Sequence, residues 1–181
     1  MNSFSDRFDL TAYDAFMQRH TKDVAFALAT LKYRIVDAST TTIAELGAGT
    51  GRFSLPLFSH YPLSRLFFLE PDDQCMSQLQ KKLPSCPHHH FISSDVQGLT
   101  QKELDAVVIV EAFHHIPLAM KQKALEKMRE SLSSQGIIVL VDEFIDEYTT
   151  SKERMQILKK SADTWVENHN RFINVPHHHE V

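Results

Sequence analysis

The most constraining feature of the sequence is a short apolar run that leads into a glycine-rich turn. Residues 42–46 read Thr-Ile-Ala-Glu-Leu, and residues 47–51 read Gly-Ala-Gly-Thr-Gly. Glycine adopts positive φ at no steric cost and lets the backbone approach a bound molecule closely. The first turn of a following helix offers free N–H groups to that molecule. We therefore predict a strand, a tight turn and a helix that together bind a nucleotide-like ligand.

The spacing of the glycines distinguishes among the known glycine-rich loops. A P-loop and a dinucleotide-binding loop would both place a glycine at position 52, where this chain has Arg52. The first is therefore excluded, and the second, with the NAD(P) oxidoreductase that it would imply, fits poorly. The pattern observed is GxGxG, with Glu45 two residues before the first glycine.

Short apolar runs alternate with helix-like segments along the chain. The remaining runs are residues 66–70, 90–93, 106–110 and 136–142, and the helix-like segments are 53–60, 73–83, 118–132 and a short one near 98–103. Two of the runs are apolar almost throughout, which is typical of parallel strands that are buried on both faces. The alternation predicts a doubly wound α/β fold, with a mostly parallel sheet of about five strands and helices on both faces.

Charge and cysteine content exclude several classes of function. The net charge of -4 disfavours a protein that binds nucleic acid through many phosphate contacts. Cys75 and Cys86 form neither a disulfide framework nor a CxxC pair. No signal peptide or membrane-spanning run is recognisable. We expect a cytoplasmic protein without a membrane partner.

The glycine pattern resembles a motif of a known superfamily. Glu45-x-Gly47-x-Gly49-x-Gly51 is similar to motif I of class I AdoMet-dependent methyltransferases. The resemblance implies that S-adenosyl-L-methionine is the cofactor. It also implies that the carboxylate of Glu45 acts near the methionine ammonium, and that the loop, with Ala48, passes close to the methionine and ribose. The expected activity is methyl transfer to an unidentified small-molecule acceptor.

Further positions match the same superfamily at the ends of later strands. Glu70, followed by Pro71, lies where the family has its ribose-binding acid. Asp95 and Val96 resemble the adenine-binding motif II, although Asp95 could equally cap a helix. Glu111 begins a segment that resembles motif IV, which flanks the methyl donor. All of these positions follow strands, where ligands bind open α/β sheets.

The resemblance covers roughly residues 8–145 and divides the chain as follows. The whole of residues 1–181 is expected to be one domain, with an N-terminal helical segment at 8–37, a Rossmann-like core at 42–145 and a C-terminal helix at 150–172. Asp9 and Thr11 are candidate N-caps of the first segment. Tyr13 is a candidate lid residue over the cofactor, with simple packing as the alternative.

No catalytic residue can be assigned from sequence, because the cofactor supplies most of the reactivity. His114 and His115 are the best candidates for a general base, and Glu143 is a weaker one. The histidine runs at 88–90 and 177–179 are not expected to bind metal, because adjacent side chains of an extended segment point to opposite faces. We therefore predict no metal site.

The expected C-terminal strands six and seven are not recognisable in the sequence. The apolar strand at 136–142 would then lie at an exposed edge, and such edges invite pairing with another chain. We expect self-association through this edge, or a chain that is part of a longer protein. The same observation supports the alternative function, a catalytically inactive or truncated AdoMet-fold protein that acts as a binding or regulatory partner.

Overall fold

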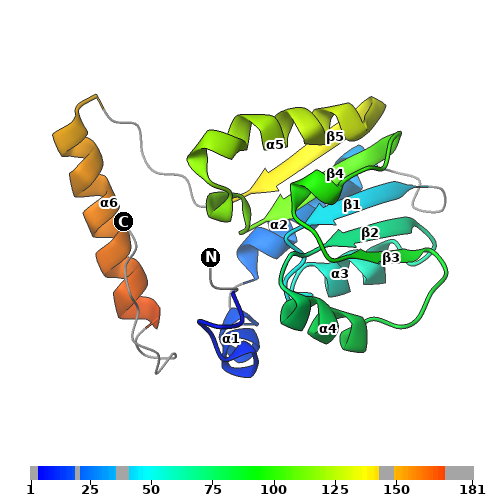
Figure 1. The fold of residues 1–181 in the computed structure, drawn as a ribbon, viewed down its shortest axis with the longest axis horizontal. Coiled ribbons are helices and arrows are strands. Elements are labelled where there is room, and N and C mark those ends of the chain that lie inside the picture. Colours follow the sequence, from blue (N-terminus) through cyan, green and yellow to red (C-terminus); the bar gives the residue numbers. More distant parts are fainter. Residues whose placement is uncertain (1–3, 19–20, 36–40, 143–148, 170–181) are drawn as a thin grey trace.

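The fold is a five-stranded parallel sheet covered by helices, as a computed structural model shows (Figure 1). The structure describes residues 4–18, 21–35, 41–142 and 149–169. The strands are β1 (Thr42–Leu46), β2 (Arg65–Leu69), β3 (His89–Ile92), β4 (Leu104–Val110) and β5 (Leu132–Val141). They lie in the order β3-β2-β1-β4-β5, and every neighbouring pair is parallel. The prediction of a doubly wound α/β fold is confirmed.

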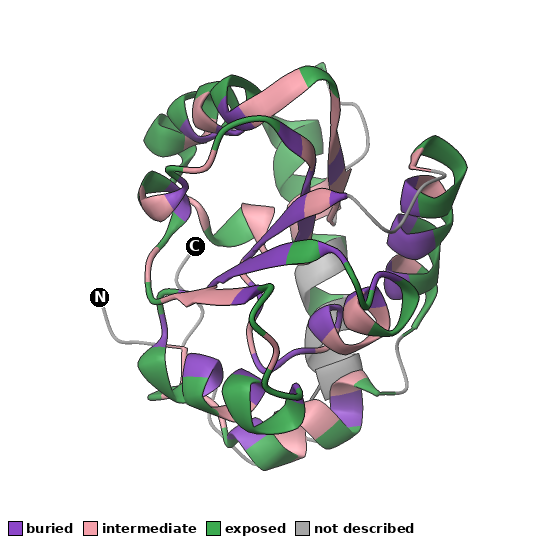
Figure 2. Ribbon diagram, turned by 90° about the vertical axis from the view of Figure 1, so that its right-hand side faces the viewer, coloured by how far each residue is buried: buried purple, intermediate pink, exposed green. Residues whose placement is uncertain are grey.

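Helices cover both faces of this sheet. The helices are α1 (Leu10–Met17), α2 (Lys22–Arg34), α3 (Ser54–His60), α4 (Asp73–Lys82), α5 (Leu118–Ser131) and α6 (Ser151–His169), with single 3-10 turns η1 (Val96–Gly98) and η2 (Phe113–His115). One core cluster packs α2, α3 and α4 against one face, through residues such as Leu31, Leu57 and Leu79. The other packs α5 and η1 against the opposite face, through Ala124, Met128 and Val96. The buried residues are therefore concentrated along the strands and on the helix faces that pack against them, as the coloured ribbon shows (Figure 2).

The helical segment expected at 8–37 contains two helices, α1 and α2. Two local predictions need correction. Asp9 caps α1 by accepting from the backbone N–H groups of Thr11 and Ala12, so Thr11 lies inside the helix and is not its cap. The short helix expected near 98–103 is only the turn η1, because the chain leaves helical geometry at Leu99, whose side chain is buried.

The fifth strand also begins earlier than predicted. α5 ends at Ser131 and β5 starts at Leu132, with an irregular register to β4 near that end. Within the described residues, β5 pairs only with β4 and forms one edge of the sheet. Pairing of this edge with another chain stays a prediction. No helix in the described part of the chain is long and apolar enough to cross a membrane.

Candidate functional site

The glycine turn lies at the carboxyl edge of the sheet, between β1 and α3. The N–H groups of Gly47 and Ala48 both donate to the carbonyl oxygen of Leu69, at 2.9 and 3.0 Å, which bends the turn over the end of β2. Gly47, Gly49 and Gly51 have φ values of +68°, +55° and +101°. Side chains are strained at such angles, so the backbone itself explains the glycine pattern.

The glycines differ in what surrounds them. A Cβ atom on Gly47 would lie 2.5 Å from the Cβ of Ala112, because the turn packs directly on the chain that follows β4. A Cβ on Gly51 would lie 2.9 Å from Leu79 Cδ1. At Gly49 no heavy atom lies within 4 Å of that position. Gly47 and Gly51 are therefore needed for packing, whereas Gly49 faces open space.

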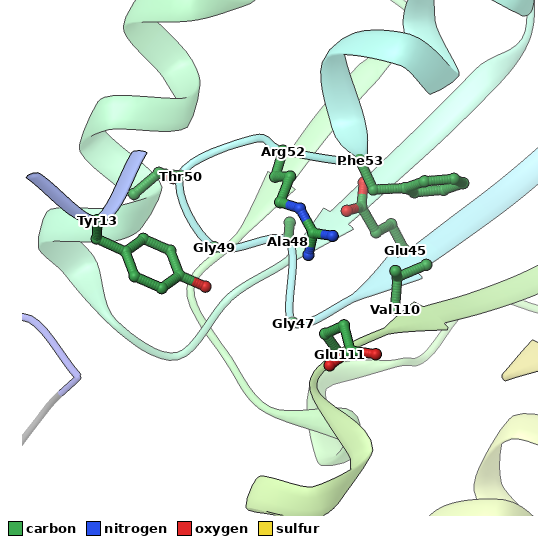
Figure 3. A pocket seen from close by; sticks show the side chains of 10 residues that line it. All are labelled: Tyr13, Glu45, Gly47, Ala48, Gly49, Thr50, Arg52, Phe53, Val110 and Glu111. Atoms are coloured by element: carbon green, nitrogen blue, oxygen red, sulfur yellow. The ribbon is translucent and has the colours of Figure 1, made fainter. Parts of the chain in front are cut away.

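That open space is a small cavity beside the turn, with a volume of about 50 Å³ (Figure 3). Its walls come from α1, β1, the glycine turn, the start of α3 and the end of β4. It is lined by Tyr13, Glu45, Gly47, Ala48, Gly49, Thr50, Arg52, Phe53, Val110 and Glu111. Ligand pockets usually measure about 300–1,000 Å³. A cofactor would therefore need the side chains that cover the cavity to move aside.

Glu45 gives the cavity a buried carboxyl group. The residue is only 2% exposed, and within the described residues its Oε2 atom has no hydrogen-bond partner. Burial raises the pKa of Glu45 to about 8, although the side chain of Ser54 acts in the opposite direction, and the nearby charge of Glu70 adds to the rise. A buried carboxylate is costly unless it is paired with a cation or with donors. The site is therefore suited to a ligand that brings a positive charge.

Glu70, at the end of β2, holds the turn from behind. Its Oε2 accepts from the N–H of Gly49 and its Oε1 from the N–H of Asp72, each at 2.8 Å. Burial raises the pKa of Glu70, and these two hydrogen bonds act in the opposite direction. Glu70 does not line the cavity itself, but it fixes the glycine that does.

The N-terminal segment is tied across the same edge. Thr50 and Lys82 both bond to the carboxylate of Asp14 on α1, and Lys82 Nζ also donates to the Thr50 carbonyl at 2.7 Å. These contacts hold Tyr13 against the cavity, with its ring directed toward the glycine turn (Figure 3). Burial raises the pKa of Tyr13 to about 12, so its hydroxyl is neutral. Tyr13 thus lines the cavity, and its role as a lid over the cofactor stays a prediction.

Arg52 lines the cavity and contributes a cation to its wall. The guanidinium of Arg52 forms an ion pair with Asp23 of α2. Sequence reasoning noticed Arg52 only as a mismatch to other loops. It also missed Thr50 and Val110, which are immediate neighbours in sequence of predicted residues, and Phe53, which lies two residues after Gly51.

At the end of β4 the backbone turns sharply at Glu111. This residue has a φ of +51°, and its N–H donates to the carbonyl of Val141 at 2.7 Å, which keeps the ends of β4 and β5 together. The chain then enters η2, which carries His114 and His115. His114 Nδ1 lies 2.6 Å from Asp142 Oδ1, and the His114 N–H donates to Asp142 Oδ2 at 2.9 Å.

The two adjacent histidines have different surroundings. The side chain of His114 is 44% exposed, whereas that of Asp142 is 2% exposed. The ring of His115 packs edge-on against Phe4, with 6.2 Å between centroids. His115 is itself exposed, and desolvation of its ring, followed by the neighbouring His114, lowers its pKa to about 4. The sequence did not single out Asp142, which it placed only as the last residue of a predicted strand.

The sequence predicted no metal site, but one cluster of ligand-type side chains lies at the ends of β4 and β5. Glu111, His114 and Asp142 bring ligand-type atoms within 4.8 Å of one another. However, both oxygens of Asp142 already accept hydrogen bonds from His114. The histidine run at 88–90 does not converge: His89 packs edge-on against Phe58 and His90 stacks on Phe67.

The predicted cofactor residues divide into two groups. Glu45, Gly47, Ala48, Gly49 and Glu111 line the cavity, whereas Gly51, Glu70, Pro71, Asp95 and Val96 do not.

Asp95 caps η1 by accepting from the N–H of Gln97 at 2.8 Å, which is the alternative role considered for it. Glu143 and the histidines at 177–179 lie outside the described residues.

Comparison with known proteins agrees with this arrangement. A family model described as a methyltransferase domain matches residues 44–138. An uncharacterized methyltransferase of Bacillus cytotoxicus is 27% identical over 158 residues, which are 82% of this chain and 72% of that protein. Another, from Alkaliphilus oremlandii, is 28% identical over 70% of this chain and 56% of its own length.

Solved structures share the fold. The plantazolicin methyltransferase BpumL, in complex with a monoazolic desmethylPZN analog and SAH, superposes with a TM-score of 0.64 at 20% identity, over 91% of this chain and 59% of that one. The sugar N-methyltransferase KedS8 from Streptoalloteichus superposes with a TM-score of 0.57 at 17% identity, over 75% of this chain and 57% of that one. This chain thus spans less than two thirds of the length of either solved protein.

Proposed function

The chain belongs to the methyltransferase-domain family, and we propose that it is a class I AdoMet-dependent methyltransferase that acts on a small-molecule acceptor. The observation that carries the proposal is the buried carboxyl group of Glu45, whose Oε2 has no hydrogen-bond partner within the described residues. AdoMet carries an α-ammonium group, which would supply the missing positive charge. The glycine turn beside Glu45 allows the methionine part of such a ligand to approach the backbone.

The residues at the rim fit the other parts of the cofactor. A carboxylate has about four acceptor sites, so Glu70 retains capacity for ribose hydroxyls while it holds Gly49 and Asp72. Asp95 and the backbone of Val96 follow β3 and would meet the adenine. Tyr13, held over the cavity by the contacts of Asp14, would exclude water from the bound ligand.

The proposed chemistry divides between cofactor and protein. Bound AdoMet supplies an electrophilic methyl group on a sulfonium, and the protein positions the acceptor in line with it. Glu111 lines the cavity at the end of β4 and would mark the side on which the acceptor enters.

A small acceptor is supported by two structural neighbours, a plantazolicin methyltransferase in complex with a monoazolic desmethylPZN analog and a sugar N-methyltransferase. The alternative, an inactive AdoMet-fold partner protein, would bind the cofactor without turnover.

Calorimetric titration of the protein with AdoMet and with its demethylated product tests the proposal. We expect both to bind, and we expect Glu45→Gln to weaken binding by about 10- to 100-fold, the value of a charge-assisted contact. Glu130→Gln, on the exposed surface of α5, is the matched control and should bind as the wild type does. Failure of both ligands to bind the wild type would refute the proposal.

Proton release gives the same titration a second readout. Because the pKa of Glu45 is about 8, its carboxyl is mostly protonated at pH 7 before the cationic ligand arrives. Pairing with an ammonium would ionise it, so binding should release about one proton at pH 7. Titrations in two buffers of different ionisation enthalpy measure this number. Glu45→Gln should release none from this position.

A further inference from the structure

Asp142 holds His114 by two hydrogen bonds, one to the ring and one to the backbone N–H. Its Oδ1 lies 2.6 Å from His114 Nδ1, and its Oδ2 accepts from the His114 backbone N–H at 2.9 Å. An ionised carboxylate only accepts hydrogen bonds, so Nδ1 must carry the ring proton. The neutral ring then has its lone pair on Nε2, which is the atom able to take up a proton. A carboxylate that fixes the tautomer and orientation of an imidazole is the arrangement of a histidine base.

The backbone brings this pair beside the cavity. The parallel register places Val110 of β4 opposite Val141 of β5, so Glu111 and Asp142 follow at the same level of the sheet. Glu111 lines the cavity, and its ligand-type atom lies within 4.8 Å of those of His114 and Asp142. The imidazole therefore stands next to the wall of the cavity that β4 provides, and it is not part of the glycine turn that would bind the cofactor.

The neighbouring histidine is less suited to accept a proton. The pKa of His115 is lowered to about 4, which is far from the operating pH at which a general base works best. Its ring also packs against Phe4. Of the two candidates in η2, the structure favours His114.

On these grounds we propose that His114 is the general base of the methyl transfer, that Asp142 positions it, and that the acceptor atom is the oxygen of a hydroxyl group. This inference rests on the AdoMet-dependent activity proposed above. A neutral amine already has a lone pair and can attack a methyl group before it loses a proton. A phenol or alcohol is a weak nucleophile until its proton is removed, so an oriented base is useful mainly for hydroxyl acceptors.

The proposed reaction is a single in-line displacement at the methyl carbon. The hydroxyl proton moves to His114 Nε2 while the acceptor oxygen forms a bond to the methyl carbon. The carbon–sulfur bond breaks, and its electron pair stays on the sulfur, which leaves as a neutral thioether. The imidazolium, paired with the Asp142 carboxylate, then gives its proton to solvent through its exposed side.

A first experiment needs no acceptor. Nitrogen NMR of the ¹⁵N-labelled full-length protein reports which ring nitrogen of His114 carries the proton. We expect the proton on Nδ1 in the wild type and a change of tautomer in Asp142→Asn, whose amide can donate to the ring. A wild-type ring protonated on Nε2 would overturn the proposal whether or not AdoMet binds.

The second experiment uses pairs of phenols and anilines with the same ring, with AdoMet as donor. We expect methylation of the phenols, and we expect His114→Asn to lower kcat by at least about 100-fold, the usual contribution of a general base. AdoMet affinity should be unchanged, which separates this failure from a failure of cofactor binding. His88→Asn, in the exposed turn before β3 at the opposite edge of the sheet, should leave turnover unaltered.

The pH profile separates a positioning role of Asp142 from a merely structural one. In Asp142→Asn the acidic limb of the rate profile should move to lower pH, because no carboxylate stabilises the protonated ring.

Phenol methylation that survives in His114→Asn, or a clear preference for the anilines, would contradict the proposal. Turnover that is lost on chelation and recovered on addition of Mn²⁺ would also contradict the proposal. It would indicate instead that Glu111, His114 and Asp142 bind a cation. Absence of methylation with every phenol, in a protein that binds AdoMet, would likewise contradict the proposal.

Discussion

Two buried carboxyl groups lie at the same edge of the sheet and are used in opposite ways. Glu45 belongs to β1 and is 2% exposed, and the side chain of Asp142, just after β5, is equally buried. Asp142 has both oxygens bonded to His114, whereas Glu45 has an oxygen without a partner within the described residues. The chain satisfies one carboxylate itself and leaves the other to be satisfied by a ligand.

This difference determines how each group responds to its environment. A buried carboxylate without donors is costly, and the molecule avoids the cost by keeping Glu45 protonated, with a pKa of about 8. Asp142 gains its donors within the fold. We therefore expect changes at Glu45 to alter ligand binding and changes at Asp142 to alter the fold and the orientation of His114.

The largest expected effect on stability is at Gly47, where the glycine turn after β1 contacts the chain that follows β4. Gly47→Ala adds a Cβ 2.5 Å from that of Ala112 at a φ of +68°. Left-handed strain and overpacking together should lower the free energy of unfolding by about 3 kcal/mol or more, as urea denaturation would measure.

Gly49→Ala is the matched control, since it has similar strain at a φ of +55° but no neighbour within 4 Å. It should cost only about 1–2 kcal/mol, and it should weaken AdoMet binding because it fills ligand space. Equal destabilisation by the two variants would contradict the close contact between the regions.

The sequence predicted the segment of Glu45 and the glycines better than it predicted the pair of His114 and Asp142. Glu45 and the glycines form one continuous segment, so their proximity in space follows from their proximity in sequence. His114 and Asp142 are 28 residues apart, and only the parallel pairing of β4 with β5 brings them together. That pairing was predicted, but the positive φ of Glu111 was not, because an acidic residue gives no local signal for it.

The other differences between prediction and structure arise where a local sequence is compatible with more than one role or helix boundary. The side chain of Asp95 matches the adenine-binding position, but it also fits a helix cap, and the backbone of η1 offers it a donor. Apolar periodicity over 8–37 predicted helix correctly but could not place the break between α1 and α2. The strand pattern was more reliable, because buried parallel strands need continuous apolar runs.

The next largest effect is expected at Asp142. Asp142→Asn replaces a carboxylate that accepts two hydrogen bonds with an amide that can accept only through one atom. We expect the free energy of unfolding to fall by about 1–3 kcal/mol, the usual cost of a buried group left without its partner. Asp163→Asn, on the exposed surface of α6, is the control and should change stability little. An unchanged stability in Asp142→Asn would mean that the contact with His114 contributes nothing to the fold.

The smallest net effect on stability is expected for Glu45→Gln, because burial of the glutamine amide offsets much of the gain, and this effect has the opposite sign. The native state holds a proton on Glu45 up to a pKa of about 8, whereas the unfolded chain releases it near the ordinary glutamate pKa of 4.5. The native state therefore binds more protons across this window, and the wild type loses stability as pH rises through it. Glutamine does not titrate, so Glu45→Gln should melt higher than the wild type at pH 8 by at least about 2–4 °C, equivalent to roughly 1 kcal/mol. At pH 4 the two should melt together.

Saturating AdoMet should reverse that order. A ligand that binds only the native state stabilises it in proportion to its affinity, and the wild type keeps the carboxylate that the ammonium requires. With excess AdoMet at pH 8, the wild type should therefore melt above Glu45→Gln, although without ligand it melts below. A Glu45→Gln variant that is less stable in both conditions would show that the carboxyl group serves the fold as Asp142 does, and the contrast between the two acids would fail. A crossover would mean that the fold tolerates an unpaired buried acid at β1 because the cofactor is its partner.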